Sequence, residues 1–186
     1  MRRVAQGVGW VLPVVYPLAA WWGIVTFGAR VAGLIVLVAF VALALSRVRS
    51  FKGLRSRELL WVGAAISGLI FSSILFDDQR FLLTMPVLVN AVLLAGFGVS
   101  LLGGRTPIVE SFARAAGEIL SAEQVGYCRS VTKVWCWFFA LNGLVSLWLA
   151  LWGSVASWGL YTGGLAYILV GLLFAGEYAV RKIRFG

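Results

Sequence analysis

The sequence predicts an all-α membrane protein: a polytopic bundle of six transmembrane helices, paired as three hairpins, with one amphipathic helix at the membrane interface. Three observations lead to this fold class. Hydrophobic residues make up 61% of the 186 positions, and charged residues make up only 12%, which is too few to coat a soluble globule. The apolar residues form long uncharged runs. Short polar or basic segments separate these runs, as loops separate membrane spans.

We expect residues 1–186 to form a single integral membrane domain, because no soluble domain or linker interrupts the series of apolar runs. The predicted spans cover about residues 8–27, 29–46, 59–76, 82–102, 130–152 and 158–177, and the interfacial helix covers about residues 107–120.

The first predicted span is the least regular. Pro13 and Pro17 lie one helical turn apart within it, so this helix should be kinked or re-entrant. A cleaved signal peptide is the competing interpretation, but the prolines fall inside the would-be apolar region and no clean A-x-A site follows. A tight turn at residues 28–30 should lead into the second span.

The loop after the second span is the most basic segment of the chain. Its cations are expected to contact anionic lipid headgroups; they are Arg47, Arg49, Lys52, Arg55 and Arg57. The formal charge of +9 does not indicate nucleic-acid binding, because the basic residues fall in the gaps between apolar runs. All of the 16 lysines and arginines except Arg30 and Arg80 fall on one side of a six-span topology. That side, with both termini, should be cytoplasmic.

A polar turn containing Asp77, Asp78 and Arg80 joins the third and fourth spans. We expect one aspartate to pair with Arg80 and the other to cap the next helix; the alternative is a recognition site for a partner or a lipid. A metal site is disfavoured, because aspartate-rich motifs for Mg²⁺ need a third aspartate one turn on, where this chain has Phe81 and Leu82. No metal and no cofactor is predicted.

The predicted interfacial helix begins with Thr106 as its N-cap, followed by Pro107. Glu110, Arg114 and Glu118 should stack along its polar side, opposite apolar residues at helical spacing. This pattern is typical of a helix that lies on a membrane surface. Ser121 and Gln124 form a capping box that should open the next helix.

A few polar and small residues lie inside the spans. Asn90 and Asn142 each fall near the middle of a predicted span. There each should bond to a neighbouring helix or line a polar cavity. Gly159 and Gly163 form a GxxxG motif, which indicates close helix packing within the bundle or in a homo-oligomer. Cys128 is eight residues from Cys136 on one predicted helix, about 12 Å apart, so both should remain thiols.

The composition also limits the chemistry. The chain has no histidine, which removes the imidazole base and the Ser-His-Asp triad, and no catalytic residue is predicted. No charged residue lies at the middle of a span, which disfavours an ion-coupled transporter.

The order of these segments resembles the intracellular septation protein A-like family of bacterial inner-membrane proteins. It is similar in particular to the uncharacterised membrane proteins found beside acyl-chain and aryl-polyene biosynthesis genes. The resemblance lies in the D-D-x-R-F element and in a tryptophan-containing helix; the matching residues are Asp77, Asp78, Arg80, Phe81, Trp135, Phe138, Phe139, Asn142 and Gly143. It implies a bacterial inner-membrane location and a role in the cell envelope.

We therefore expect a non-enzymatic inner-membrane protein that supports envelope assembly, or envelope lipid and acyl-chain metabolism. It would act through contacts with membrane lipids or with envelope or acyl-chain biosynthesis proteins. The alternative is a passive carrier or flippase for an amphipathic, lipid-like molecule, with Asn90, Asn142 and the turn from Asp77 to Arg80 lining its route. A membrane-bound acyl-chain enzyme is a third hypothesis, for which the sequence offers no identifiable nucleophile and base.

Overall fold

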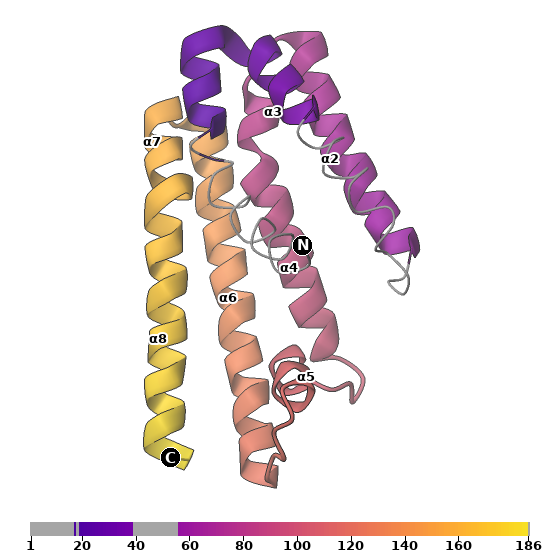
Figure 1. The fold of residues 1–186 in the computed structure, drawn as a ribbon, viewed down its shortest axis with the longest axis vertical. Coiled ribbons are helices and arrows are strands. Elements are labelled where there is room, and N and C mark those ends of the chain that lie inside the picture. The colour runs from indigo at the N-terminus through magenta and orange to yellow at the C-terminus, as the bar shows by residue number, and fades with distance from the viewer. Residues whose placement is uncertain (1–16, 18, 39–55, 186) are drawn as a thin grey trace, which may run out of the picture. The chain divides into compact units, whose positions relative to one another are not determined.

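The computed structural model describes residue 17, residues 19–38 and residues 56–185, with the backbone alone for residues 56–65. All regular structure in these ranges is helical, which confirms the all-α class (Figure 1). The helices are Ala19–Val38, α2 (Ser56–Phe76), α3 (Arg80–Leu83), α4 (Met85–Ser100), α5 (Ile108–Ala115), α6 (Ala122–Trp152), α7 (Val155–Leu160), the π-helical turn η1 (Tyr161–Leu165) and α8 (Ala166–Phe185).

Four helices in the described ranges are long and apolar enough to cross a membrane, which is consistent with a membrane protein. By length and composition they are Ala19–Val38, Arg80–Ser100, Ala122–Trp152 and Val155–Phe185. The first of these folds back at Gly28, so neither of its described halves is long enough to cross a membrane by itself. The last three include the predicted spans 82–102, 130–152 and 158–177 almost entirely. Half of the predicted first span and the end of the second lie outside the described residues, so the arrangement as three hairpins remains a prediction.

The helix Ala19–Val38 does not run straight. Gly28 has a φ of +81°, and a Cβ atom on Gly23 would lie 3.4 Å from the Cβ of Ala32. Residues nine positions apart in a straight α-helix are separated by about 13.5 Å. The chain therefore folds back at Gly28 (Figure 1), where a positive φ suits glycine. This is the tight turn that the sequence predicts at residues 28–30.

The chain divides into two compact units. The first comprises the described part of Met1–Pro86 together with Ser146–Ile168. Its core is apolar and centres on Trp158, Ile70 and Leu82, each with no exposed surface. Gly33 contributes a close contact to this unit, because a Cβ atom there would lie 2.7 Å from the Oγ of Ser73.

The second unit comprises Val87–Val145 and Leu169–Gly186. Within it α4 and α6 run antiparallel, since Asn90 contacts Asn142 while Leu101 contacts Arg129. The space between these helices and α8 is filled by an aromatic cluster around Trp135, whose ring centroid lies 4.7 Å from that of Phe174. The other rings of the cluster are Phe97, Phe138 and Phe139.

Helix α5 is shorter than the predicted interfacial helix over residues 107–120. Gly117 has a φ of +89°, and the N–H groups of Gly117 and Glu118 bond the carbonyls of Arg114 and Ala113. This pattern is a Schellman motif, which ends a helix. Ile119 lies beyond it and is 98% exposed. The position of α5 at a membrane interface remains a prediction.

The start of α5 also differs from the prediction. Pro107 occupies the N-cap position, and no side chain caps the helix there. The first free N–H of the helix, on Ile108, instead donates to the Oγ of Ser100 at the end of α4 over 3.1 Å. The expected cap by Thr106 is therefore wrong.

Candidate functional site

The polar turn between α2 and α3 is built by its two aspartates in different ways. Asp77 has a φ of +53°, a left-handed conformation that aspartate tolerates better than most residues. Asp78 follows, and its Oδ1 accepts a 2.8 Å hydrogen bond from the backbone N–H of Arg80. Gln79 holds the N-cap position of α3, and no side chain caps that helix. The expected cap by an aspartate is therefore wrong, and the bond to Asp78 instead closes an Asx turn just before the helix.

The ion pair at this turn has a different partner from the predicted one. The Oδ2 of Asp77 lies 3.4 Å from the Nε of Arg30, whereas Arg80 was expected to be the partner. Arg30 follows the Gly28 turn, so the pair links the folded-back Ala19–Val38 helix to the α2–α3 turn within the first unit. Both side chains are more than half exposed, and such pairs contribute about 0.2–1 kcal/mol to stability.

The same residues line an open depression of about 620 Å³. Its lining residues are Ala29, Phe76, Asp77, Asp78, Gln79 and Arg80. The rings of Phe76 and Phe81 stack beside it, with centroids 5.8 Å apart. The depression therefore presents both signs of charge and an amide next to exposed aromatic surface, a combination suited to a polar headgroup or a charged segment of another protein.

The two asparagines of the predicted spans bond to each other. The Nδ2 of Asn142 donates to the Oδ1 of Asn90 over 3.0 Å, and a Cβ atom on the adjacent Gly143 would lie 3.2 Å from the Cβ of Asn90. The prediction that each amide bonds to a neighbouring helix is confirmed. The bond ties α4 to α6, which leaves the carrier hypothesis without support from these residues.

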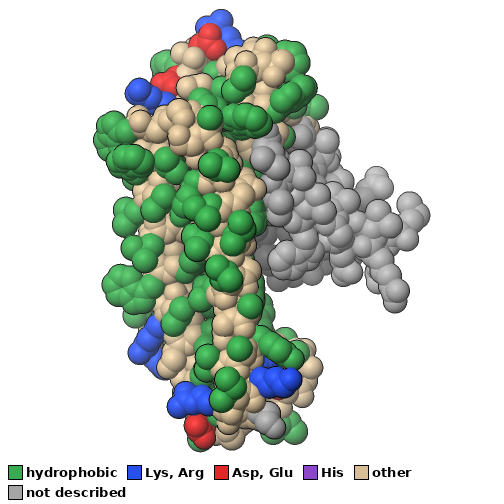
Figure 2. All heavy atoms as spheres, turned by 90° about the vertical axis from the view of Figure 1, so that its left-hand side faces the viewer, with side chains coloured by type: hydrophobic (Ala, Val, Ile, Leu, Met, Phe, Trp, Pro, Cys, Tyr) green, Lys and Arg blue, Asp and Glu red, His purple; other side chains and the backbone are tan. Residues whose placement is uncertain are grey.

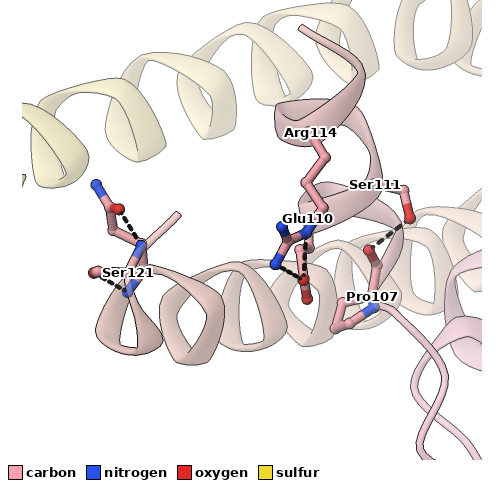
Figure 3. Close-up of polar contacts among 6 residues, drawn as sticks. Pro107, Glu110, Ser111, Arg114 and Ser121 are labelled. Carbon is pink, nitrogen blue, oxygen red and sulfur yellow. Dashed lines mark hydrogen bonds and ion pairs between the residues drawn. The ribbon is translucent and has the colours of Figure 1, made fainter. Parts of the chain in front are cut away.

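Ion pairs organise the charged end of the second unit. Glu110 is buried, and its Oε1 lies 2.8 Å from both the Nε and an Nη of Arg114 (Figure 3). Glu118 does not continue this stack, because α5 has already ended; it pairs with Arg181 of α8 over 3.3 Å. Arg181 also lies 3.7 Å from Glu177.

The predicted capping box is present at the start of α6. The backbone N–H of Ser121 donates to the Oε1 of Gln124 over 2.8 Å, and the N–H of Gln124 donates to the Oγ of Ser121 over 3.3 Å (Figure 3). Cys128 and Cys136 are free thiols, as expected from their spacing.

Both glycines of the GxxxG motif lie in described helices. Gly159 is buried against Trp21, since a Cβ atom there would lie 3.0 Å from the indole ring, and Gly163 lies in η1. Of the five predicted headgroup-binding residues, Arg47, Arg49, Lys52 and Arg55 lie outside the described residues. Arg57 lies in the first turns of α2, where the backbone alone is described.

The chain was compared with family models, curated proteins and solved structures, and none of the three comparisons gave a match. The resemblance to the septation protein A-like family therefore remains a prediction from the residues that carry it.

Proposed function

We propose that the protein is a non-enzymatic component of the bacterial inner membrane that supports cell-envelope assembly, or envelope lipid and acyl-chain metabolism, through contacts with lipids and partner proteins. Both termini lie in the cytoplasm, and the α2–α3 turn lies on the opposite side.

The observation that carries this proposal is how polar and apolar groups are distributed over the described helices. Large apolar side chains are exposed along them, as Figure 2 shows for one face, and α8 has no buried residue at all. The buried polar side chains Ser73, Thr132 and Thr162 each donate to a carbonyl of their own helix. A surface of this kind suits acyl chains and partner helices.

The depression at the α2–α3 turn is the part of this surface best suited to a specific contact. Arg80 is exposed there, and its side chain takes no part in the pair between Asp77 and Arg30. Its guanidinium is therefore available to a phosphate or carboxylate, while Gln79 adds an amide. This depression is where partner or lipid recognition is proposed to occur.

The proposal is tested by deleting the gene in its bacterial host and measuring envelope lipid composition and sensitivity to detergent. Deletion should change at least one of these, and the wild-type gene should restore it. The variant with Gln79→Ala and Arg80→Ala should be inserted in the membrane at the wild-type level but should restore it poorly. A matched variant with Lys182→Ala and Arg184→Ala, in the last turns of α8, should complement fully.

Two results would contradict the proposal. One is a deletion strain with an unchanged envelope. The other is turnover of an acyl-chain or lipid substrate by the purified protein alone, which would make it an enzyme.

A further inference from the structure

The charged end of the second unit holds cations that no carboxylate neutralises. Of the four glutamates in this unit, Glu110, Glu118 and Glu177 are engaged by Arg114 or Arg181. The fourth, Glu123, is exposed and forms no ion pair with a described residue. Within residues 56–185, no ion pair is formed by Arg105, Arg129 or Lys133, which are all exposed. Three of the unpaired cations therefore lie where α4 ends and α6 begins, and Lys182 and Arg184 lie at the end of α8.

The fold brings these three cations to the same place. Arg129 is held by its Nη2, which donates to the carbonyl of Leu101 over 2.7 Å. Arg105 lies in the turn that follows α4, where its backbone N–H donates to the carbonyl of Leu102 over 3.1 Å. Lys133 is one helical turn beyond Arg129 and therefore lies on the same side of α6. The other donors of the Arg129 guanidinium remain available.

An exposed apolar stripe continues from these cations along α6. Trp137, Leu141 and Leu144 follow Lys133 at four, eight and eleven residues, which is the spacing of one helix face. Their exposed fractions are 70%, 59% and 62%. Tryptophan is enriched at the level of lipid headgroups, so Trp137 marks the depth at which the cations would meet phosphate.

We infer that this face of α6 binds one anionic phospholipid, with its phosphate at Arg129 and Lys133 and an acyl chain along Trp137, Leu141 and Leu144. This inference deepens the proposed function, because it assigns one lipid class to one surface. The charge balance selects an anionic headgroup. A zwitterionic headgroup would need a carboxylate for its amine, and Glu123, six residues before Arg129, lies on a different face of α6.

The test is a lipid titration of the full-length protein in detergent micelles, followed by native mass spectrometry. Dioleoyl phosphatidylglycerol is compared with dioleoyl phosphatidylcholine, which has the same chains and no net charge. The wild type should bind its first molecule of phosphatidylglycerol at least tenfold more tightly than its first molecule of phosphatidylcholine. Arg129→Gln with Lys133→Gln should remove that preference, and Arg129→Lys should keep most of it.

Lys182→Gln with Arg184→Gln is the matched control, because it removes two exposed cations from the α8 end of the same unit. Its phosphatidylglycerol affinity should stay within about twofold of the wild type. Equal losses in both double variants would show attraction by overall charge and would overturn the site. Binding of inorganic phosphate as tightly as phosphatidylglycerol would also overturn it, because the acyl chain would then contribute nothing.

Lys133→Gln alone leaves the bond from Arg129 to Leu101 intact, so it tests the site even if the Arg129 variants unfold. It should weaken phosphatidylglycerol binding while the helical content is unchanged, and full retention of binding would contradict the inference. If the lipid preference fails while the deletion strain still has an altered envelope, the lipid site is wrong and the proposed function stands.

Discussion

The indole Nε1 of Trp158 donates a 2.9 Å hydrogen bond to the backbone carbonyl of Leu83, and 0% of Trp158 and 2% of Leu83 is exposed. This carbonyl lies at the break between α3 and α4. Pro86 has no N–H to offer the preceding turn, so the helical hydrogen-bond ladder is interrupted here. Thr84 satisfies a second carbonyl at the break, that of Phe81, over 2.8 Å. Trp158 therefore stabilises a helix interruption as well as filling the core of the first unit.

Trp158→Phe should destabilise the protein by about 1–3 kcal/mol, because a buried carbonyl loses its donor while most of the ring volume remains. The free energy of unfolding can be measured by titrating sodium dodecyl sulfate into mixed micelles. Trp152→Phe is the control, since Trp152 is exposed, and it should change the free energy by less than about 0.5 kcal/mol. Equal effects of the two substitutions would show that the bond to Leu83 does not contribute.

The bond between Asn90 and Asn142 should appear as a coupling energy. In a double-mutant cycle of Asn90→Ala and Asn142→Ala, the interaction should be about 0.6 kcal/mol and no more than about 1.7 kcal/mol, the range found for hydrogen bonds between transmembrane helices. Additive single effects would mean that each amide is satisfied by other groups. The measurement is the same unfolding titration.

Several features of the candidate site could be predicted because they depend on neighbouring residues or on burial alone. The capping box of Ser121 and Gln124 is local. The pairing of Asn90 with Asn142 follows from the cost of leaving an amide unbonded among apolar helices. The cap expected from an aspartate of the turn is not among these features, because Gln79 lies between Asp78 and α3 and holds the N-cap position.

Other features depend on which distant segments meet. Arg30 could not be paired with Asp77 from local spacing, although the count of basic residues had already placed Arg30 and Arg80 on the same side as this turn. The end of α5 had a local signal in Gly117, but the apolar spacing continued to Ile119 and Leu120 and favoured a longer helix. The bond from Trp158 to the carbonyl of Leu83 has no sequence signal, because any carbonyl at a break can accept it.

The partner of Asp77 can be established with neutralising substitutions. Asp77→Asn keeps a residue that tolerates a positive φ, and Arg30→Gln removes the cation. The coupling energy between these two substitutions should be about 0.2–1 kcal/mol, and salt should reduce it, because the pair is exposed. The cycle of Asp77→Asn with Arg80→Gln should show coupling near zero, and a larger coupling there than with Arg30 would restore the pair that the sequence predicted.

The proposed orientation predicts where a cysteine at Gln79 can be labelled. In a background with Cys128→Ala and Cys136→Ala, Gln79→Cys should react with a membrane-impermeant maleimide in intact cells. The reason is that nearly all of the lysines and arginines lie on the other side of the predicted topology, and such residues are retained in the cytoplasm. Gln79 lines the open depression, so the reagent can reach it. Lys182→Cys, on the exposed end of α8, should react only after the cells are permeabilised. The reverse pattern would place the α2–α3 turn in the cytoplasm and would move the proposed recognition surface to the opposite side of the membrane.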